Sequence, residues 1–233
     1  MIQPTLLQDI PVTFAPDALL PRLRLRPGSS EAKEFEELVA QAQPLARPRA
    51  AFLVGYIDHK DDEGVVVDGV RFTSRVLRTN LDAAHRAFAY IATCGLELQE
   101  WAGSLYDVLH QFWAEEIKVA ALRAATQAVM DEIAVLNPGK MASMNPGSLP
   151  DWPIQEQKPF FQLLGDASAA IGVTLSDSCL MTPNKSVTGL RFANTNDWVN
   201  CRLCTREACP GRAAPYDAAF HAERYRNAGL ASQ

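Results

Sequence analysis

The feature that most constrains the fold is a proline-free stretch of about 40 residues, from Glu97 to Leu136. Apolar side chains recur along it at helical spacing, and small alanines cluster near its middle. This periodicity is typical of an amphipathic helix. The sequence "NPG" that follows is a helix-terminating signal. We therefore predict one long helix crossing the core, which Gly103 can break, with room for a neighbouring element to approach the alanines closely.

Four other segments have strand character. "AAFLVGYID" and "GVVVDGVRFTS" are rich in β-branched and aromatic residues and are separated by the polar "HKDDEG", which predicts an antiparallel hairpin. "AFAYIATCG" and "SVTGLRFAN" predict two more strands, and "SSEAKEFEELVAQAQPLA" predicts a serine-capped helix. Helices and short strands mix without regular βαβ alternation. We therefore expect an α+β fold: a twisted antiparallel sheet with a long central helix and flanking helices.

Composition excludes several classes of protein. The chain has 233 residues, is 48% hydrophobic and carries a net charge of -5. It shows no basic stripe of the kind that neutralises phosphates, so we expect no nucleic-acid partner. Apolar runs are too short to span a bilayer, and the N-terminus lacks a signal-peptide pattern. We therefore expect a cytoplasmic protein with no membrane partner. Hydrolase, P-loop and dinucleotide-binding motifs are absent.

A second feature is the spacing M-x-P-x-x-S-V-x-G, formed by Met181, Pro183, Ser186, Val187 and Gly189. It resembles the C-terminal motif of the activation domain of vitamin B12-dependent methionine synthase. Upstream, "ATCGLELQE" and "NPGSLPDWPIQEQKPFFQLLG" resemble the corresponding segments of that family. The likeness covers roughly residues 50 to 192 and extends more faintly to the N-terminus. The chain resembles a stand-alone member of the family.

This resemblance implies a function. In the family, the domain binds S-adenosylmethionine and presents it to a cobalamin that has reached the inert cob(II)alamin state. One-electron reduction then lets methyl transfer restore the cofactor. The resemblance thus implies an accessory protein, associated with cobalamin-dependent methionine synthase activity, that supports reductive reactivation. Its partner would be a corrinoid protein or cobalamin-dependent methyltransferase, which carries the cobalamin.

The ligand-binding loop of the family has the form R-x-x-P-G-Y, and here it reads "SMNPGS". Serines replace the arginine and the tyrosine, at Ser143 and Ser148. A serine supplies neither the charge nor the fork of an arginine, so we predict weak or absent binding of S-adenosylmethionine. The resemblance implies the following cofactor-binding residues: Ser143, Asn145, Pro146, Gly147, Met181, Pro183, Ser186, Val187 and Gly189.

Cysteines form the third feature, because Cys201, Cys204 and Cys209 fall within nine residues of a chain with only five cysteines. An odd, clustered set in a reducing compartment indicates a metal site rather than a disulfide scaffold. Zinc ions and iron-sulfur clusters take four such ligands. We predict Cys179, inside the motif, as the fourth ligand, with Cys94 as the alternative.

Two observations favour an iron-sulfur cluster over zinc. A zinc site usually needs a second ligand pair, and the histidines His59, His85, His110 and His221 supply none. The loop is also locally basic, with Arg202, Arg206 and Arg212 against Glu207, which favours a negatively charged cluster. The favoured function is therefore electron donation to the corrinoid partner through this cluster.

Alternatives remain beside this function. The cysteines can also bind zinc or remain as thiols without metal. The alternative functions are then an S-adenosylmethionine-binding activator or a component of cobalamin-dependent methionine synthesis, both without redox function. A third alternative is a zinc-stabilised binding module. We divide the chain into residues 1–192, which resemble the activation domain, a cysteine-rich loop at 193–220 in the same globular unit, and a tail at 221–233.

Overall fold

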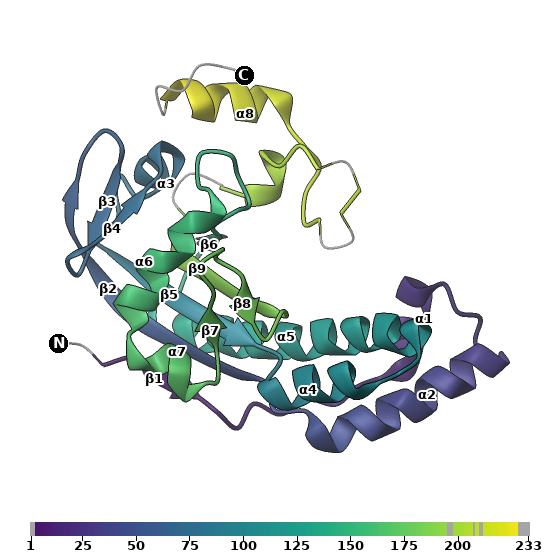
Figure 1. Ribbon diagram of the computed structural model, residues 1–233. Helices are drawn as coiled ribbons and strands as arrows, with labels where there is room; N and C mark the ends of the chain where they lie inside the picture. Colours follow the sequence, from purple (N-terminus) through teal and green to yellow (C-terminus); the bar gives the residue numbers. More distant parts are fainter. Residues whose placement is uncertain (1–2, 195–197, 207, 210–211, 228–233) are drawn as a thin grey trace.

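The computed structural model describes residues 3–194, 198–206, 208–209 and 212–227. Seven strands form one antiparallel sheet in the order β4-β3-β2-β5-β9-β6, with β1 pairing onto β2 (Figure 1). This confirms the predicted α+β class. The strands of the sheet are β1 (Thr5–Leu7), β2 (Arg49–Lys60), β3 (Gly64–Val67), β4 (Val70–Thr73), β5 (Arg86–Thr93), β6 (Met141–Met144) and β9 (Ser186–Ala193).

Helices cover both faces of the centre of the sheet. On one face, Phe52 of β2 and Tyr90 of β5 pack with α5 (Val108–Leu136). On the other face, Leu53 and Ile91 pack with α6 (Gln157–Leu164) and α7 (Asp166–Ala170). This division follows from strand geometry, because successive side chains point to opposite faces. Figure 1 shows α6 and α7 on one side of the sheet and α5 behind it.

The predicted long helix is present but interrupted. It forms α4 (Leu96–Ser104) and α5, and the break falls just after Gly103. Asp107 restarts the helix, because its Oδ1 accepts the backbone N–H of Leu109 at 2.6 Å and of His110 at 3.2 Å. Of the alanines in α5, Ala125 packs on the sheet and Ala121 packs on the preceding helices.

An arm of helices packs on the first half of α5. It contains α1 (Pro16–Leu23), α2 (Ser30–Ala42) and α4, and Figure 1 shows it at the lower right. Ser29 caps α2 by accepting the N–H of Ala32, and Phe35 meets Trp113 edge-on with ring centroids 5.9 Å apart. These are the flanking helices that the sequence predicts.

Two parts of the sheet differ from expectation. The run "GVVVDGVRFTS" contains two strands, β3 and β4, joined at Asp68 and Gly69, whose φ angles of 44° and 79° suit a tight hairpin turn. β6 is not among the strands that the sequence predicts, and it pairs with β9 at the sheet edge. Shorter elements are η1 (Gln43–Leu45), α3 (Arg75–Asn80), η2 (Ile154–Glu156), β7 (Thr174–Leu175), β8 (Met181–Thr182) and η3 (Asn200–Arg202).

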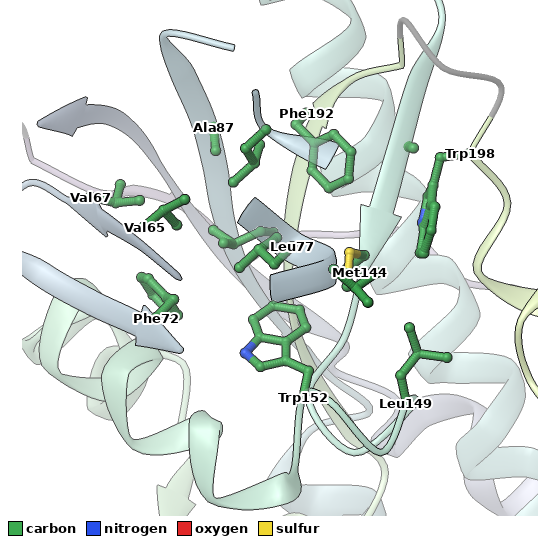
Figure 2. Packing of buried hydrophobic residues seen from close by; sticks show 14 of the residues in the cluster. Val65, Val67, Phe72, Leu77, Ala87, Met144, Leu149, Trp152, Phe192 and Trp198 are labelled. Atoms are coloured by element: carbon green, nitrogen blue, oxygen red, sulfur yellow. The ribbon is translucent and has the colours of Figure 1, made fainter. Parts of the chain in front are cut away.

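The C-terminal segment packs on the same core as the sheet. Trp198 lies beside Met144 and Leu149 in Figure 2, and Leu203 and Phe220 belong to the same buried cluster. Residues up to 227 of the predicted tail lie in α8 (Ala218–Asn227). Residues 228–233 of that tail are outside the described part of the chain.

None of the helices in the described ranges combines the length and the apolar character that crossing a bilayer requires.

Candidate functional site

The predicted motif residues lie on both sides of β9. Ser186 lines a groove of about 410 Å³ with Met181 and the start of α6, which we call the α6 groove. Val187 lines a second groove of about 550 Å³ between α5 and the sheet, which we call the α5 groove. Consecutive strand residues point to opposite faces, so Ser186 and Val187 cannot serve the same side. The motif thus contributes to two grooves.

The α5 groove has a mixed lining. Apolar side chains come from α5 and β9, and polar groups come from β5, α5 and the turn after β6. Its lining residues are Tyr90, Val119, Leu122, Arg123, Thr126, Gln127, Asn145 and Val187. A concave, partly apolar surface with a few convergent polar groups is the usual form of a small-molecule site.

Asn145 organises the polar end of the α5 groove. Its Nδ2 donates to the Tyr90 hydroxyl at 2.8 Å and to the Thr188 backbone carbonyl at 2.7 Å. Gly189 makes room for this arrangement, because a Cβ there would lie 2.5 Å from Asn145 Nδ2 and 2.6 Å from Tyr90 Oη. The turn is closed by Gly147, whose φ is +78° and whose N–H donates to the Trp152 carbonyl at 2.7 Å. Pro146 is buried beside it.

Ser143 belongs to the same polar cluster. Its hydroxyl accepts a hydrogen bond from Arg191 Nη1 at 3.2 Å across the β6–β9 pair, where the two residues are directly opposite. Burial raises the pKa of the Tyr90 hydroxyl above its usual range, against the lowering effect of Asn145, Ser143 and Arg191. Tyr90 is therefore a neutral hydrogen-bonding group at physiological pH.

The loop between β8 and β9 is pinned to the helices by buried charge. Lys118, whose side chain is 1% exposed, pairs with Glu115 at 2.5 Å and donates to Asn184 Oδ1 at 3.0 Å. Lys185 also pairs with Glu115, at 2.6 Å. The Thr182–Pro183 peptide in this loop is cis, and Pro183 is buried.

Electrostatics within this cluster favour the ionised carboxylate. Burial opposes the charge on Glu115, but the hydrogen bonds from Lys118 and Lys185 outweigh it and lower the pKa of the carboxyl. The buried ion pair has a structural role here. Its hydrogen bond to Asn184 and its shared partner Glu115 fix the positions of Asn184 and Lys185 in the predicted motif.

The predicted metal ligands are not brought together. Cys179 is buried in the turn before β8, lines the α6 groove and has a φ of 63°. Cys201, Cys204 and Cys209 are half-buried on the C-terminal loop. Within the described ranges, no three histidine, cysteine, aspartate or glutamate side chains form a group that could hold a metal ion. Glu207, which we counted in the charge of this loop, is outside those ranges.

A guanidinium occupies the interior of the cysteine loop. Arg212 Nη1 donates to the backbone carbonyls of Cys201 at 3.0 Å and Ala214 at 3.2 Å. Its Nη2 donates to the carbonyls of Cys204, at 3.2 Å, and Arg206. The loop is thus closed by hydrogen bonds to one side chain.

The alternative fourth ligand, Cys94, is a buried thiol. It is fully buried at the end of β5, and burial raises the pKa of its thiol to about 11. A thiol with that pKa stays protonated near neutral pH. Cys94 behaves as the small buried hydrophobic residue that an isolated cysteine in an apolar strand usually is.

No protein-family model matches the sequence, and no curated protein matches it. Among solved structures, the chain is similar to a crystal structure of the MetH reactivation domain bound to AdoHcy. The chain has the fold of that domain. The TM-score is 0.62 at 13% sequence identity, and the match covers 85% of this chain and 80% of the other.

The sequence did not predict several residues that line the two grooves, nor the cluster of charged residues around Lys118. Tyr90 and Arg191 are predicted only as strand residues, and Leu122 and Lys118 only as parts of a helix. Lys118 meets Asn184 across 66 positions of sequence, and Asn145 meets Tyr90 across 55. A lysine at helical spacing from the apolar positions Ala114 and Ala121 was the one local signal available.

Proposed function

We propose that this chain is an accessory protein for the reductive reactivation of a cobalamin-dependent methyltransferase of the methionine synthase type. The observation that carries the proposal is the likeness of fold, over 85% of the chain, to a MetH reactivation domain. The M-x-P-x-x-S-V-x-G spacing supports the proposal independently, because this spacing is a property of the sequence and does not depend on the likeness of fold.

The chemical role that the geometry supports best is binding of an S-adenosyl ligand. In the reaction proposed here, cob(II)alamin on the partner takes one electron from an external low-potential donor. The resulting cob(I)alamin attacks the sulfonium methyl group, so the cobalt–carbon bond forms as the sulfur–methyl bond breaks and S-adenosylhomocysteine leaves. This chain would hold the ligand in the α5 groove, whose lining combines apolar side chains with Asn145 and Tyr90.

A reactivation assay tests this role. A cobalamin-dependent methionine synthase lacking its own reactivation domain is oxidised to cob(II)alamin, and methylcobalamin is followed by its visible absorbance with S-adenosylmethionine and a chemical reductant. We expect faster recovery when this chain is added. Leu122→Glu, which puts a carboxylate into the α5 groove, should abolish the gain, whereas Arg26→Gln, on an exposed loop, should keep it. No gain with the unaltered chain would contradict the proposal.

Electron donation through a cysteine-bound cluster is a separate hypothesis. The described arrangement of Cys179 and the C-terminal cysteines does not assemble its ligands, so we route no step through a cluster. Iron and acid-labile sulfide analysis of anaerobically purified protein tests it. Brown protein with both elements in near-equal amounts would establish the cluster. Colourless protein, with or without zinc, would remove it from the proposed function.

A further inference from the structure

Arg191 carries a charge that the described part of the protein does not neutralise. Its side chain is half-buried in β9, and burial lowers the pKa of its guanidinium. Among the described residues it makes one side-chain hydrogen bond, from Nη1 to Ser143 Oγ, while its buried Nε has no partner and no carboxylate pairs with it. Partly burying a cation without a counter-ion is costly. Such a cost is expected where the counter-ion is a ligand.

The position of Arg191 relates this charge to the α5 groove. Val187, Gly189 and Arg191 alternate along β9 and therefore share one face of the sheet. Val187 lines the groove, and Gly189 lies against Asn145 and Tyr90, which also line it. Arg191 continues this row and connects to the same cluster through Ser143.

The groove itself favours an anion. Its lining includes Arg123 and several neutral side chains, and none of its described lining residues is acidic. A concave surface with arginine and without carboxylates attracts negative charge. Its volume of about 550 Å³ is within the range of small-molecule sites.

We infer that Arg191 anchors the carboxylate of the ligand in the α5 groove and so supplies the counter-charge of that carboxylate from β9. The inference rests on the proposed function for the identity of the ligand. Arg191 and Ser143 lie directly opposite each other on paired strands. The Ser143 hydroxyl thus holds one guanidinium nitrogen of Arg191.

Calorimetric titration of the full chain tests the inference with two probes. S-adenosylhomocysteine carries the amino-acid carboxylate, and 5′-methylthioadenosine has the same nucleoside and sulfur without it. We expect Arg191→Gln to weaken S-adenosylhomocysteine binding by about tenfold or more, as for loss of a charge-assisted hydrogen bond. Methylthioadenosine should bind both proteins equally. Arg191→Lys should fall between the two, because it keeps the charge and loses the planar fork.

Stability and charge controls make the result specific. Arg26→Gln removes the same charge from an exposed loop and should leave both affinities unchanged. Thermal unfolding of ligand-free Arg191→Gln should occur at or above the wild-type temperature, because an uncompensated cation is removed. Equal loss for both probes, or unchanged S-adenosylhomocysteine binding in Arg191→Gln, would overturn the inference. If the wild-type chain binds neither probe, the inference also fails, while complex formation with the methyltransferase still tests docking on its own.

Discussion

Asn145 donates one amide hydrogen to the Tyr90 hydroxyl at 2.8 Å and the other to the Thr188 carbonyl at 2.7 Å, which ties the turn after β6 to two neighbouring strands. Two of the three positions are on the central strands β5 and β9. The polar end of the α5 groove is therefore as rigid as the sheet beneath it.

Gly189→Ala should destabilise the protein by about 2 kcal/mol, because the added methyl group overlaps the Asn145 and Tyr90 side chains. Urea unfolding followed by circular dichroism measures this change. Gly103→Ala is the matched control: nothing lies within 4 Å of the added Cβ, and it sits in α4. It should be neutral or slightly stabilising, because alanine is the better helix former. Equal effects of the two substitutions would contradict the close packing at Gly189.

Tyr90→Phe should cost about 1 kcal/mol near neutral pH, because Asn145 loses one of its two acceptors. The cost should shrink at high pH. The folded-state pKa of Tyr90 is raised by burial, so its contribution is fully present below about pH 10 and is lost as the pH rises through the folded pKa. Unfolding free energies of both proteins at pH 7 and pH 11 measure this. Tyr106→Phe, at a fully exposed position, should show no difference at either pH.

Glu115→Gln should destabilise the protein by about 2 kcal/mol at pH 7, because Lys118 stays buried without its carboxylate partner. This magnitude allows for the partial solvent exposure of Glu115. The pKa of Glu115 is lowered on folding, so the stabilisation is present above about pH 4.3 and is lost as the pH falls through the folded pKa.

Chemical denaturation of wild type and Glu115→Gln between pH 3 and pH 7 follows this loss. The difference should become smaller toward the acidic end. Glu63→Gln, from a more exposed pair with Arg75 at 3.7 Å, should differ from wild type by less than about 0.5 kcal/mol throughout. A difference for Glu115→Gln that stayed constant down to pH 3 would argue against the ion pair as its source.

Arg212→Gln should loosen the cysteine loop without unfolding the domain, because four backbone carbonyls lose a charged donor while the buried anchors Trp198 and Leu203 remain. Hydrogen exchange of peptides spanning 199–217 should become faster, and the rest of the sheet should keep its protection. Arg206→Gln removes the same charge but keeps its backbone acceptor, and it should exchange like wild type. Unchanged exchange in Arg212→Gln would show that the hydrogen bonds of Arg212 do not hold the loop in place.

Long segments with one consistent character explain which parts of the fold the sequence could predict. The helix α5 repeats buried residues at helical spacing, and β5 and β9 are eight-residue runs rich in strand-forming residues, so local sequence was sufficient. β6 has only four residues and runs into Asn145-Pro146-Gly147, which is typical of a turn. Its strand conformation comes from pairing with β9, about 48 residues away along the chain.

The candidate site was harder to predict because its parts come from distant positions. Asn145, Val187 and Gly189 lie near one another, but the motif gave no sign that Ser186 lines the other groove. The cysteine spacing predicted a shared metal site, and among the described residues no three potential ligands form such a group. Spacing along the chain describes neighbours in sequence, whereas a metal site depends on the packing of remote elements.

The alternation of Ser186 and Val187 restricts how a chain of this kind can change. Inserting or deleting a single residue in β9 would exchange every side chain between the two grooves, whereas a substitution alters one groove at a time. The length of β9 between Ser186 and Ala193 is therefore fixed by the needs of both faces together. New ligand preferences in either groove must arise by replacing side chains within an unchanged register.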